Sequence, residues 1–156
     1  MIKQLENEVT MKKILTFIKN KNNELLLLHN NPVDPIHGGD IWYTVTGGVE
    51  EIDANLESAV KREVKEETNL DVIDTMYLNI NYKYLNRRNI ECIEYAYISF
   101  VKEGNIILNE ESIGYKWLDI NTFINEIYWY SDKDELRKIL EKAINKELYY
   151  QKEVIR

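Results

Sequence analysis

Short stretches in which apolar and polar residues alternate predict strands along most of the chain. Two turn-rich tetrads, Asn-Lys-Asn-Asn at 20–23 and Asn-Arg-Arg-Asn at 86–89, each separate two such stretches and so predict two hairpins. The segment 30–40 holds both prolines and predicts a loop. The predicted strands cover residues 12–19, 24–29, 41–45, 71–85, 90–101 and 114–118.

A helical spacing of apolar residues replaces this alternation in the middle and at the end of the chain. In the middle, Asn55 is placed to cap a helix over about 55–68. Near the end, the pattern predicts a short helix at 121–128 and a C-terminal helix over about 132–147. Strands mixed with a central and a C-terminal helix are typical of an α/β or α+β sandwich.

Three glutamates gather on the last turns of the predicted central helix. Residues three and four apart are neighbours on a helix, so Glu63 faces both Glu66 and Glu67. Glu63 and Glu67 also continue the apolar stripe, where a carboxylate is costly unless it is paired or binds a metal. A solvated face of glutamate and lysine is the ordinary alternative. We expect a hard cation such as Mg²⁺, which takes one or two protein carboxylates and leaves its other positions to water and phosphate.

Composition and charge narrow the class of protein. A chain of 156 residues, 44% of them apolar, has room for one core, and we expect a single domain over 1–156. The net charge of −7 disfavours polymeric nucleic acid as a partner. The longest apolar runs, such as 25–28, fall far short of the roughly 18 residues that a membrane span needs. With no secretory signal and a lone Cys92, the sequence predicts a cytoplasmic protein that acts on a small molecule.

The segment from Gly48 to Leu70 resembles the Nudix box, G-x5-E-x7-R-E-U-x-E-E-x-G-U, in which U is a bulky aliphatic residue. The spacing matches without gaps, and Ala54 and Asn69 depart from the pattern. Asn69 is a mild change, because asparagine tolerates the left-handed geometry that ends a helix. Ala54 replaces a glutamate, for which Asp53, Glu50 or Glu51 is a candidate substitute. The matching residues are Gly48, Arg62, Glu63, Val64, Glu66, Glu67 and Leu70.

The likeness continues on both sides of this segment. Trp42 and Gly47 resemble a W-x-x-P-G-G lead-in, with Thr46 in place of the proline, and 111–117 resembles a later E-x5-W element. The family's fold would place a mixed sheet between helical layers. The resemblance implies cleavage of a nucleoside diphosphate linked to another group, by attack of water on phosphorus with Mg²⁺, or alternatively Mn²⁺. Monomer and homodimer both remain open.

The resemblance also assigns roles to individual residues. Glu63, Glu66 and Glu67 would be metal ligands, with Glu66 alternatively the base, and Arg62 would orient Glu63 or a neighbouring carboxylate. A base on a later loop is common in the family, and Glu111 is the candidate, with Glu110 as a substitute.

Candidate substrate contacts are less specific. Gly47 and Gly48 allow a close backbone approach to metal or phosphate. Among the aromatic residues Trp42, Tyr43, Tyr82, Tyr84 and Tyr95, we expect Trp42 and Tyr84 to stack on a base, although aromatics on strands are often core residues. Arg87 is a candidate phosphate contact. Two alternatives to an enzyme are a Nudix-fold module that binds a nucleotide without turnover and a structural protein whose acidic helix is coincidental.

Overall fold

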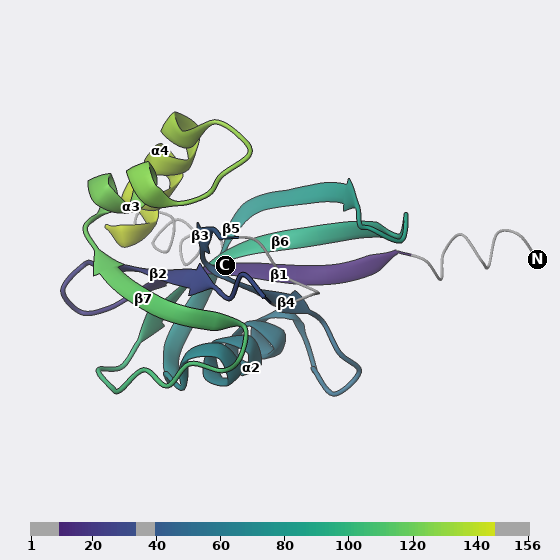
Figure 1. Ribbon diagram of the computed structural model, residues 1–156, viewed down its shortest axis with the longest axis horizontal. Coiled ribbons are helices and arrows are strands. Elements are labelled where there is room, and N and C mark those ends of the chain that lie inside the picture. The colour runs from purple at the N-terminus through teal and green to yellow at the C-terminus, as the bar shows by residue number, and fades with distance from the viewer. Residues whose placement is uncertain (1–9, 34–39, 146–156) are drawn as a thin grey trace, which may run out of the picture.

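The computed structural model describes residues 10–33 and 40–145, in which strands form one mixed sheet with helices on both faces (Figure 1). The strands are β1 (Met11–Lys19), β2 (Leu25–Asn30), β3 (Trp42–Tyr43), β4 (Val45–Gly48), β5 (Val72–Leu85), β6 (Glu91–Val101) and β7 (Ser112–Leu118). The helices are α2 (Leu56–Thr68), α3 (Ile120–Glu126) and α4 (Lys133–Ile144). In these residues no helix is both long and apolar enough to cross a membrane.

The sheet follows the order β3-β2-β1-β6-β5, with β7 paired to β2 and β4 paired to β1. Both predicted hairpins are confirmed, since β1 pairs with β2 and β5 with β6 in antiparallel fashion. β1 and β6 run parallel along their whole length. β1 meets β2 at Lys19 but pairs with β4 over Lys13 to Thr16. β2 and β4 therefore diverge from a shared strand, and the sheet opens between them.

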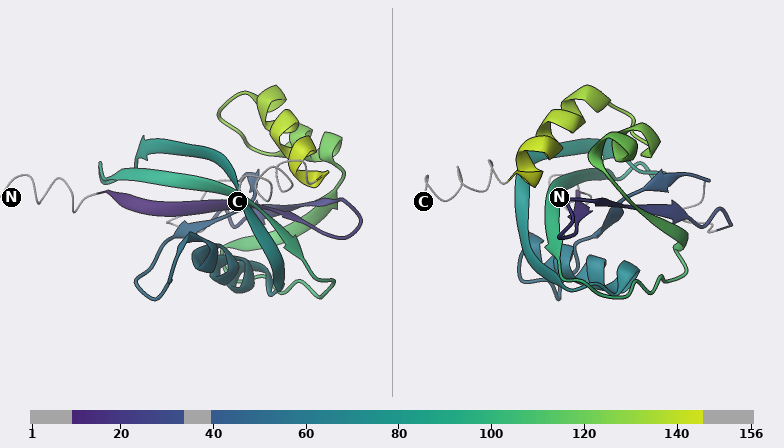
Figure 2. Two further views of the ribbon diagram at one scale, coloured as in Figure 1. Left: turned by 180° about the vertical axis from the view of Figure 1, so that it is seen from behind. Right: turned by 90° about the vertical axis from the view of Figure 1, so that its left-hand side faces the viewer.

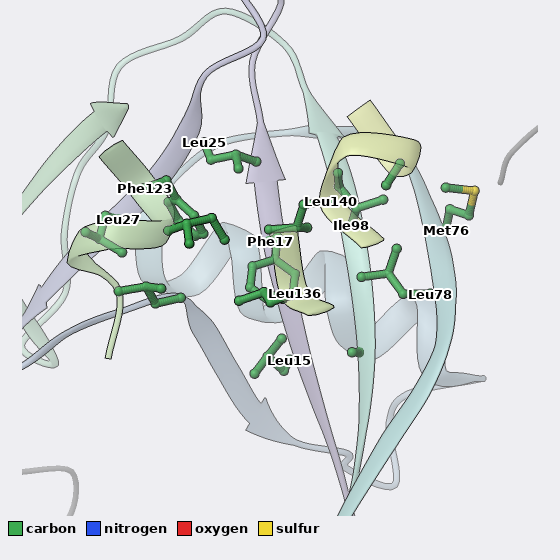
Figure 3. Close-up of a cluster of buried hydrophobic side chains, with 14 residues drawn as sticks. Leu15, Phe17, Leu25, Leu27, Met76, Leu78, Ile98, Phe123, Leu136 and Leu140 are labelled. Carbon is green, nitrogen blue, oxygen red and sulfur yellow. The ribbon is translucent and has the colours of Figure 1, made fainter. Parts of the chain in front are cut away.

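Alternation along β1 builds a hydrophobic core on each face of the sheet. Leu15 and Phe17 point to the face covered by α3 and α4, and Ile14 and Ile18 point to the face covered by α2. Figure 2 shows these two helical layers on opposite sides of the strands. Figure 3 shows the core cluster on the α3/α4 face, where Phe17 of β1 lies near Leu136 and Leu140 of α4. The predicted sandwich, with a mixed sheet between helices, is confirmed.

Local capping fixes both ends of α2. The Asn55 side chain accepts a hydrogen bond from the Ser58 backbone N–H at 2.8 Å, so Asn55 is the predicted N-cap. Asn69 ends the helix with φ of 70°, in the left-handed region, and its N–H donates to the Lys65 carbonyl. The asparagine in place of the box glycine is thus accommodated without changing the helix end.

Other predicted elements differ from the structure: the predicted strand 41–45 is divided between β3, which pairs with β2, and β4, which pairs with β1. α3 ends at Glu126 rather than 128, because the Tyr128 backbone N–H donates to the Trp42 carbonyl at 2.8 Å and draws the chain out of the helix. β7 begins at Ser112, two residues before the predicted start. Asp132 caps α4, which ends at Ile144. Residues 146–147 of the predicted helix and 34–39 of the predicted loop lie outside the described residues.

Candidate active site

Arg62 on α2 fastens the loop that follows β4 to the helix. Its Nε and Nη2 each donate to one oxygen of the Asp53 carboxylate, at 2.9 Å, and Nη2 also donates to the Gly48 carbonyl at 2.9 Å. The Asp53 side chain is only 3% exposed. The hydrogen bonds from Arg62 lower the pKa of Asp53, and the same pairing raises the pKa of Arg62.

Asp53 therefore supplies the carboxylate that Ala54 lacks. Of the three candidate substitutes, Asp53 makes the bidentate contact, whereas a Glu50 oxygen lies 3.5 Å from Arg62 and Glu51 is exposed. Asp53 also accepts the Glu50 backbone N–H at 2.8 Å. Asp53 stands one residue before the motif position, and the loop conformation still brings its carboxylate to Arg62.

Arg62 also reaches two of the three box glutamates. Its Nη1 donates to Glu63 at 2.8 Å and to Glu66 at 3.1 Å. The Glu66 side chain is 52% exposed, whereas Glu63 is buried. Two of the glutamates thus share one guanidinium, and Glu66 lies at the solvent edge of the group.

The carboxylate of Glu63 lies directly against the backbone of Gly47. A Cβ atom added at Gly47 would lie 2.1 Å from the Glu63 carboxyl carbon, a distance at which something must move. A Cβ added at Gly48 would meet nothing within 4 Å. Gly47 is therefore required by close approach, and Gly48 contributes its carbonyl oxygen to Arg62.

Glu67 carries the least compensated charge of the group. It is 5% exposed, and its Oε2 has no hydrogen-bond partner among the described residues. Burial raises the pKa of Glu67, and the nearby charge of Glu111 and contact with Glu63 raise it further. Burial raises the pKa of Glu63 as well. Glu63 already has Arg62 beside it, so a further positive charge would act mainly to favour the ionised form of Glu67.

Glu67 and Glu111 line one small cavity of about 140 Å³, which we call the acidic cavity. It lies where β2 and β4 diverge, so it is reached by side chains from strands as well as from α2. Glu111, predicted as a candidate base from the sequence, is thereby placed beside a box glutamate. The remaining lining residues are Leu28, Asn30, Tyr43, Thr44, Thr46 and Ser112.

The chemistry of these carboxylates fits a divalent cation. In the described part of the chain no three acidic, histidine or cysteine side chains are already arranged as a metal-binding cluster. Glu63 and Glu67 nevertheless adjoin each other, and one buried oxygen of Glu67 has no donor within residues 10–33 and 40–145. Mg²⁺ needs only one or two protein carboxylates, with water and phosphate as its other ligands. Glu63 and Glu67 are therefore the candidates to hold such a cation.

A larger cleft of about 620 Å³ lies on the α3/α4 face of the sheet, and we call it the tyrosine cleft. Tyr43 and Thr46 line both this cleft and the acidic cavity, so the two spaces adjoin. Burial raises the pKa of Tyr43. The lining residues are Ile41, Tyr43, Thr46, Asn81, Tyr82, Lys83, Tyr84, Glu94, Tyr128 and Tyr130.

The structure separates the predicted substrate residues. Tyr84 lines the tyrosine cleft, but Trp42 does not: its ring stacks on His29 with centroids 4.4 Å apart, and Lys116 Nζ lies 4.2 Å from its centroid. Arg87 is exposed at the β5–β6 turn and lines neither space. Roles for Trp42 and Arg87 in substrate binding stay predictions.

Several residues of the tyrosine cleft were not candidates from the sequence, Tyr128, Tyr130 and Glu94 among them. Tyr128 and Tyr130 flank a tryptophan just after α3, and this aromatic run was the signal that could have identified them. Glu94 lies within a strand of alternating pattern, and this pattern does not indicate which residues surround its side chain. Tyr95, considered from the sequence, lies instead on the α2 face beside Tyr77.

Comparison with known proteins places this geometry in a family. The model of the NUDIX domain matches residues 10–139. No curated protein matches the sequence.

Solved structures provide likenesses of fold. A MutT protein from Methanosarcina mazei Go1 has a TM-score of 0.66 and 20% identity, over 88% of this chain and 94% of that one. The E. coli dihydroneopterin triphosphate pyrophosphohydrolase has a TM-score of 0.65 and 24% identity, over 85% and 94%. A MutT NUDIX hydrolase from Burkholderia pseudomallei has a TM-score of 0.61 and 15% identity, over 85% and 96%.

Proposed function

The chain belongs to the NUDIX domain family of hydrolases, and from this premise we propose that it cleaves a nucleoside diphosphate linked to another group with the aid of a divalent cation. One observation supports the proposal: Glu67, whose buried Oε2 has no hydrogen-bond partner among the described residues, lines a cavity that adjoins an aromatic cleft. A cation in this cavity would supply the missing positive charge, and the cleft offers aromatic rings for a base.

Glu63 and Glu67 would hold Mg²⁺, with Mn²⁺ as an alternative. The bound cation would lower the pKa of a water molecule and neutralise charge that develops on the phosphoryl oxygens. Arg62, itself held by Asp53, keeps the Glu63 carboxylate in place, and Gly47 allows that carboxylate to lie against the backbone. These residues act by positioning, which requires rigid neighbours rather than mobile ones.

Two carboxylates compete for the role of base. Glu111 lines the same cavity as Glu67 and is our choice for the group that takes the proton from water. Glu66 is half-exposed and bound to Arg62, so we assign it as a third ligand or as the alternative base.

The substrate would lie across the opening between β2 and β4. Its base would occupy the tyrosine cleft and its phosphates would reach the acidic cavity past Tyr43 and Thr46. The net charge of −7 favours a small nucleotide, whose phosphates a cation screens, over a polymer. The E. coli structural neighbour is a pyrophosphohydrolase of dihydroneopterin triphosphate, a small triphosphate, which is consistent with a small phosphate-bearing substrate here. We propose a cytoplasmic location, where such nucleotides are abundant.

Release of phosphate or pyrophosphate from a panel of nucleotides, with and without Mg²⁺, tests the proposal. Glu67→Gln is expected to reduce the metal-dependent rate by at least about 10²-fold, the scale of losing one electrostatic stabiliser. Glu57→Gln, on the exposed start of the same helix, is the matched control and should retain activity. Full activity in Glu67→Gln would remove its role as ligand. Binding without turnover across the panel would instead favour a nucleotide-sensing module.

A further inference from the structure

Glu94 is a buried carboxylate on the wall of the tyrosine cleft. It is 6% exposed and lies in the middle of the sheet, beside Lys13 of β1 on one side and Tyr82 of β5 on the other. Ala96 and Ile98, which follow it at the alternation of a strand, belong to the core under α3 and α4. Glu94 therefore faces the cleft, on the side of the sheet opposite α2.

Nothing in the described part of the chain satisfies this carboxylate. Within residues 10–33 and 40–145 its side chain makes no hydrogen bond and no ion pair. Lys13 lies close enough to favour its charge, but burial outweighs that attraction and raises the pKa of Glu94 to about 7. A buried carboxylate without donors is costly, so a ligand that brings donors would relieve it.

The rings around Glu94 define the shape of that ligand. Tyr84, Tyr128 and Tyr130 are exposed to solvent at the cleft, and Tyr82 meets the Tyr130 ring edge-on with centroids 5.7 Å apart. Exposed aromatic faces of this kind stack on planar rings. The cleft volume of about 620 Å³ is in the range of small-molecule sites. A flat heterocycle would bring its polar edge to Glu94.

We propose that Glu94 selects the base of the substrate by accepting hydrogen bonds from a ring N–H and an adjacent exocyclic amino group, the edge that guanine and pterins share. The inference rests on the proposed function, since it names the base that the nucleotide site would take. An ionised carboxylate only accepts hydrogen bonds, and its two oxygens match two parallel donors.

Other bases present the wrong edge to a carboxylate. Adenine and cytosine place a ring nitrogen acceptor beside their amino group, and uracil flanks its single ring N–H with two carbonyl oxygens. Each would bring at least one lone pair against an oxygen of ionised Glu94, so the binding comparison is made at about pH 8.5, above the pKa of about 7 for Glu94. Such a base would leave the buried Glu94 carboxylate unpaired, and an unpaired buried polar group gives a site strong discrimination against the wrong ligand.

Equilibrium binding without any divalent cation tests this inference separately from hydrolysis. Calorimetric titration with GMP and with IMP compares two bases that differ only in the exocyclic amino group. A hydrogen bond to a charged group corresponds to a preference for GMP of about 10-fold or more. Glu94→Gln, which replaces one acceptor by a donor, should bring the ratio close to one. Glu91→Gln, at the exposed start of the same strand, should keep the preference.

Additional ligands and variants separate the remaining explanations. Neopterin, which carries the same donor edge, distinguishes a pterin site from a guanine site by its affinity relative to guanosine. Glu94→Asp keeps the carboxylate one methylene back and should retain part of the preference, and thermal melting of each variant reports whether it folds. Equal binding of GMP, IMP and AMP by the unmodified protein would overturn the inference. So would a preference that survives in a folded Glu94→Gln.

The outcomes also separate this inference from the proposed function. Hydrolysis of many nucleotides without preference for the donor edge would overturn the role of Glu94 and leave the enzyme assignment intact. Selective binding of GMP without Mg²⁺-dependent turnover of any nucleotide in the panel would support the role of Glu94 and overturn the proposed hydrolysis.

Discussion

Replacing Asp53 by asparagine isolates the contact that compensates for Ala54. The side chain keeps its shape, but the carboxamide presents one oxygen and one NH₂ group where Arg62 now donates to two oxygens at 2.9 Å. One hydrogen bond to a charged group is lost, and two donors then face each other. The Gly48 carbonyl remains available to Arg62, so the guanidinium keeps part of its environment.

The loss is worth about 1.5–3 kcal/mol, the range for hydrogen bonds to charged groups. Arg62 is 18% exposed and can recruit water, which places the expected destabilisation near the lower end, about 2 kcal/mol at pH 7. Because the folded state lowers the pKa of Asp53, its contribution is present above the unfolded pKa and disappears as the pH falls through the lower, folded value. The difference between the two proteins should therefore shrink in acid.

Urea denaturation at pH 7 and at acidic pH measures this difference. Since Arg62 also holds Glu63, kcat should fall by about 10-fold, a loss of roughly 1.4 kcal/mol in the transition state, with little change in KM. Glu51→Gln, an exposed neighbour in the same loop, is the control. Adding Ala54→Glu should restore part of both losses, since it returns a carboxylate to the motif position. If Asp53→Asn proves as stable as the unmodified protein at pH 7, the assigned compensation is wrong.

Four further substitutions test the site and the core. Gly47→Ala should lower kcat by about 10²-fold because it displaces the Glu63 carboxylate, whereas Gly48→Ala should have little effect on a rate assay. Because burial raises the pKa of Glu67, the metal-free protein loses stability as the pH rises above the unfolded value. In EDTA at pH 8, Glu67→Gln should therefore be more stable by about 1–3 kcal/mol, and a less stable variant would contradict this. Phe17→Ala should cost about 3–5 kcal/mol in urea titrations, and a loss below 1 kcal/mol would refute its core role.

Local signals in the sequence predicted the parts of the fold that local chemistry determines. Asn55 and Asn69 cap α2 because a side-chain acceptor and a left-handed residue are needed there, and both requirements are visible in the residue types. The two asparagine-rich tetrads likewise mark hairpin turns. The end of α3 was not predictable in this way, because it depends on a hydrogen bond to Trp42, far away in the chain.

The candidate site was predictable only where spacing along one element decides it. Glu63 and Glu67 face inward because of helical periodicity, and this holds in any helix with these residues. The choice of Asp53 among three loop carboxylates depends on loop conformation, which no pattern encodes. The approach of Glu111 to Glu67 depends on how β7 and α2 are brought together. The cleft that Glu94 lines is formed by tyrosines from three other segments, so its role could not be inferred from its own strand.

The division of β1 between two partners has an evolutionary consequence. Because β2 and β4 part from the same strand, the tyrosine cleft and the acidic cavity adjoin at Tyr43 and Thr46 while drawing most of their lining from different segments. If the proposed roles hold, substitutions among the tyrosines would alter the choice of substrate while leaving the carboxylates on α2 unchanged. In such a layout specificity could evolve separately from the reaction.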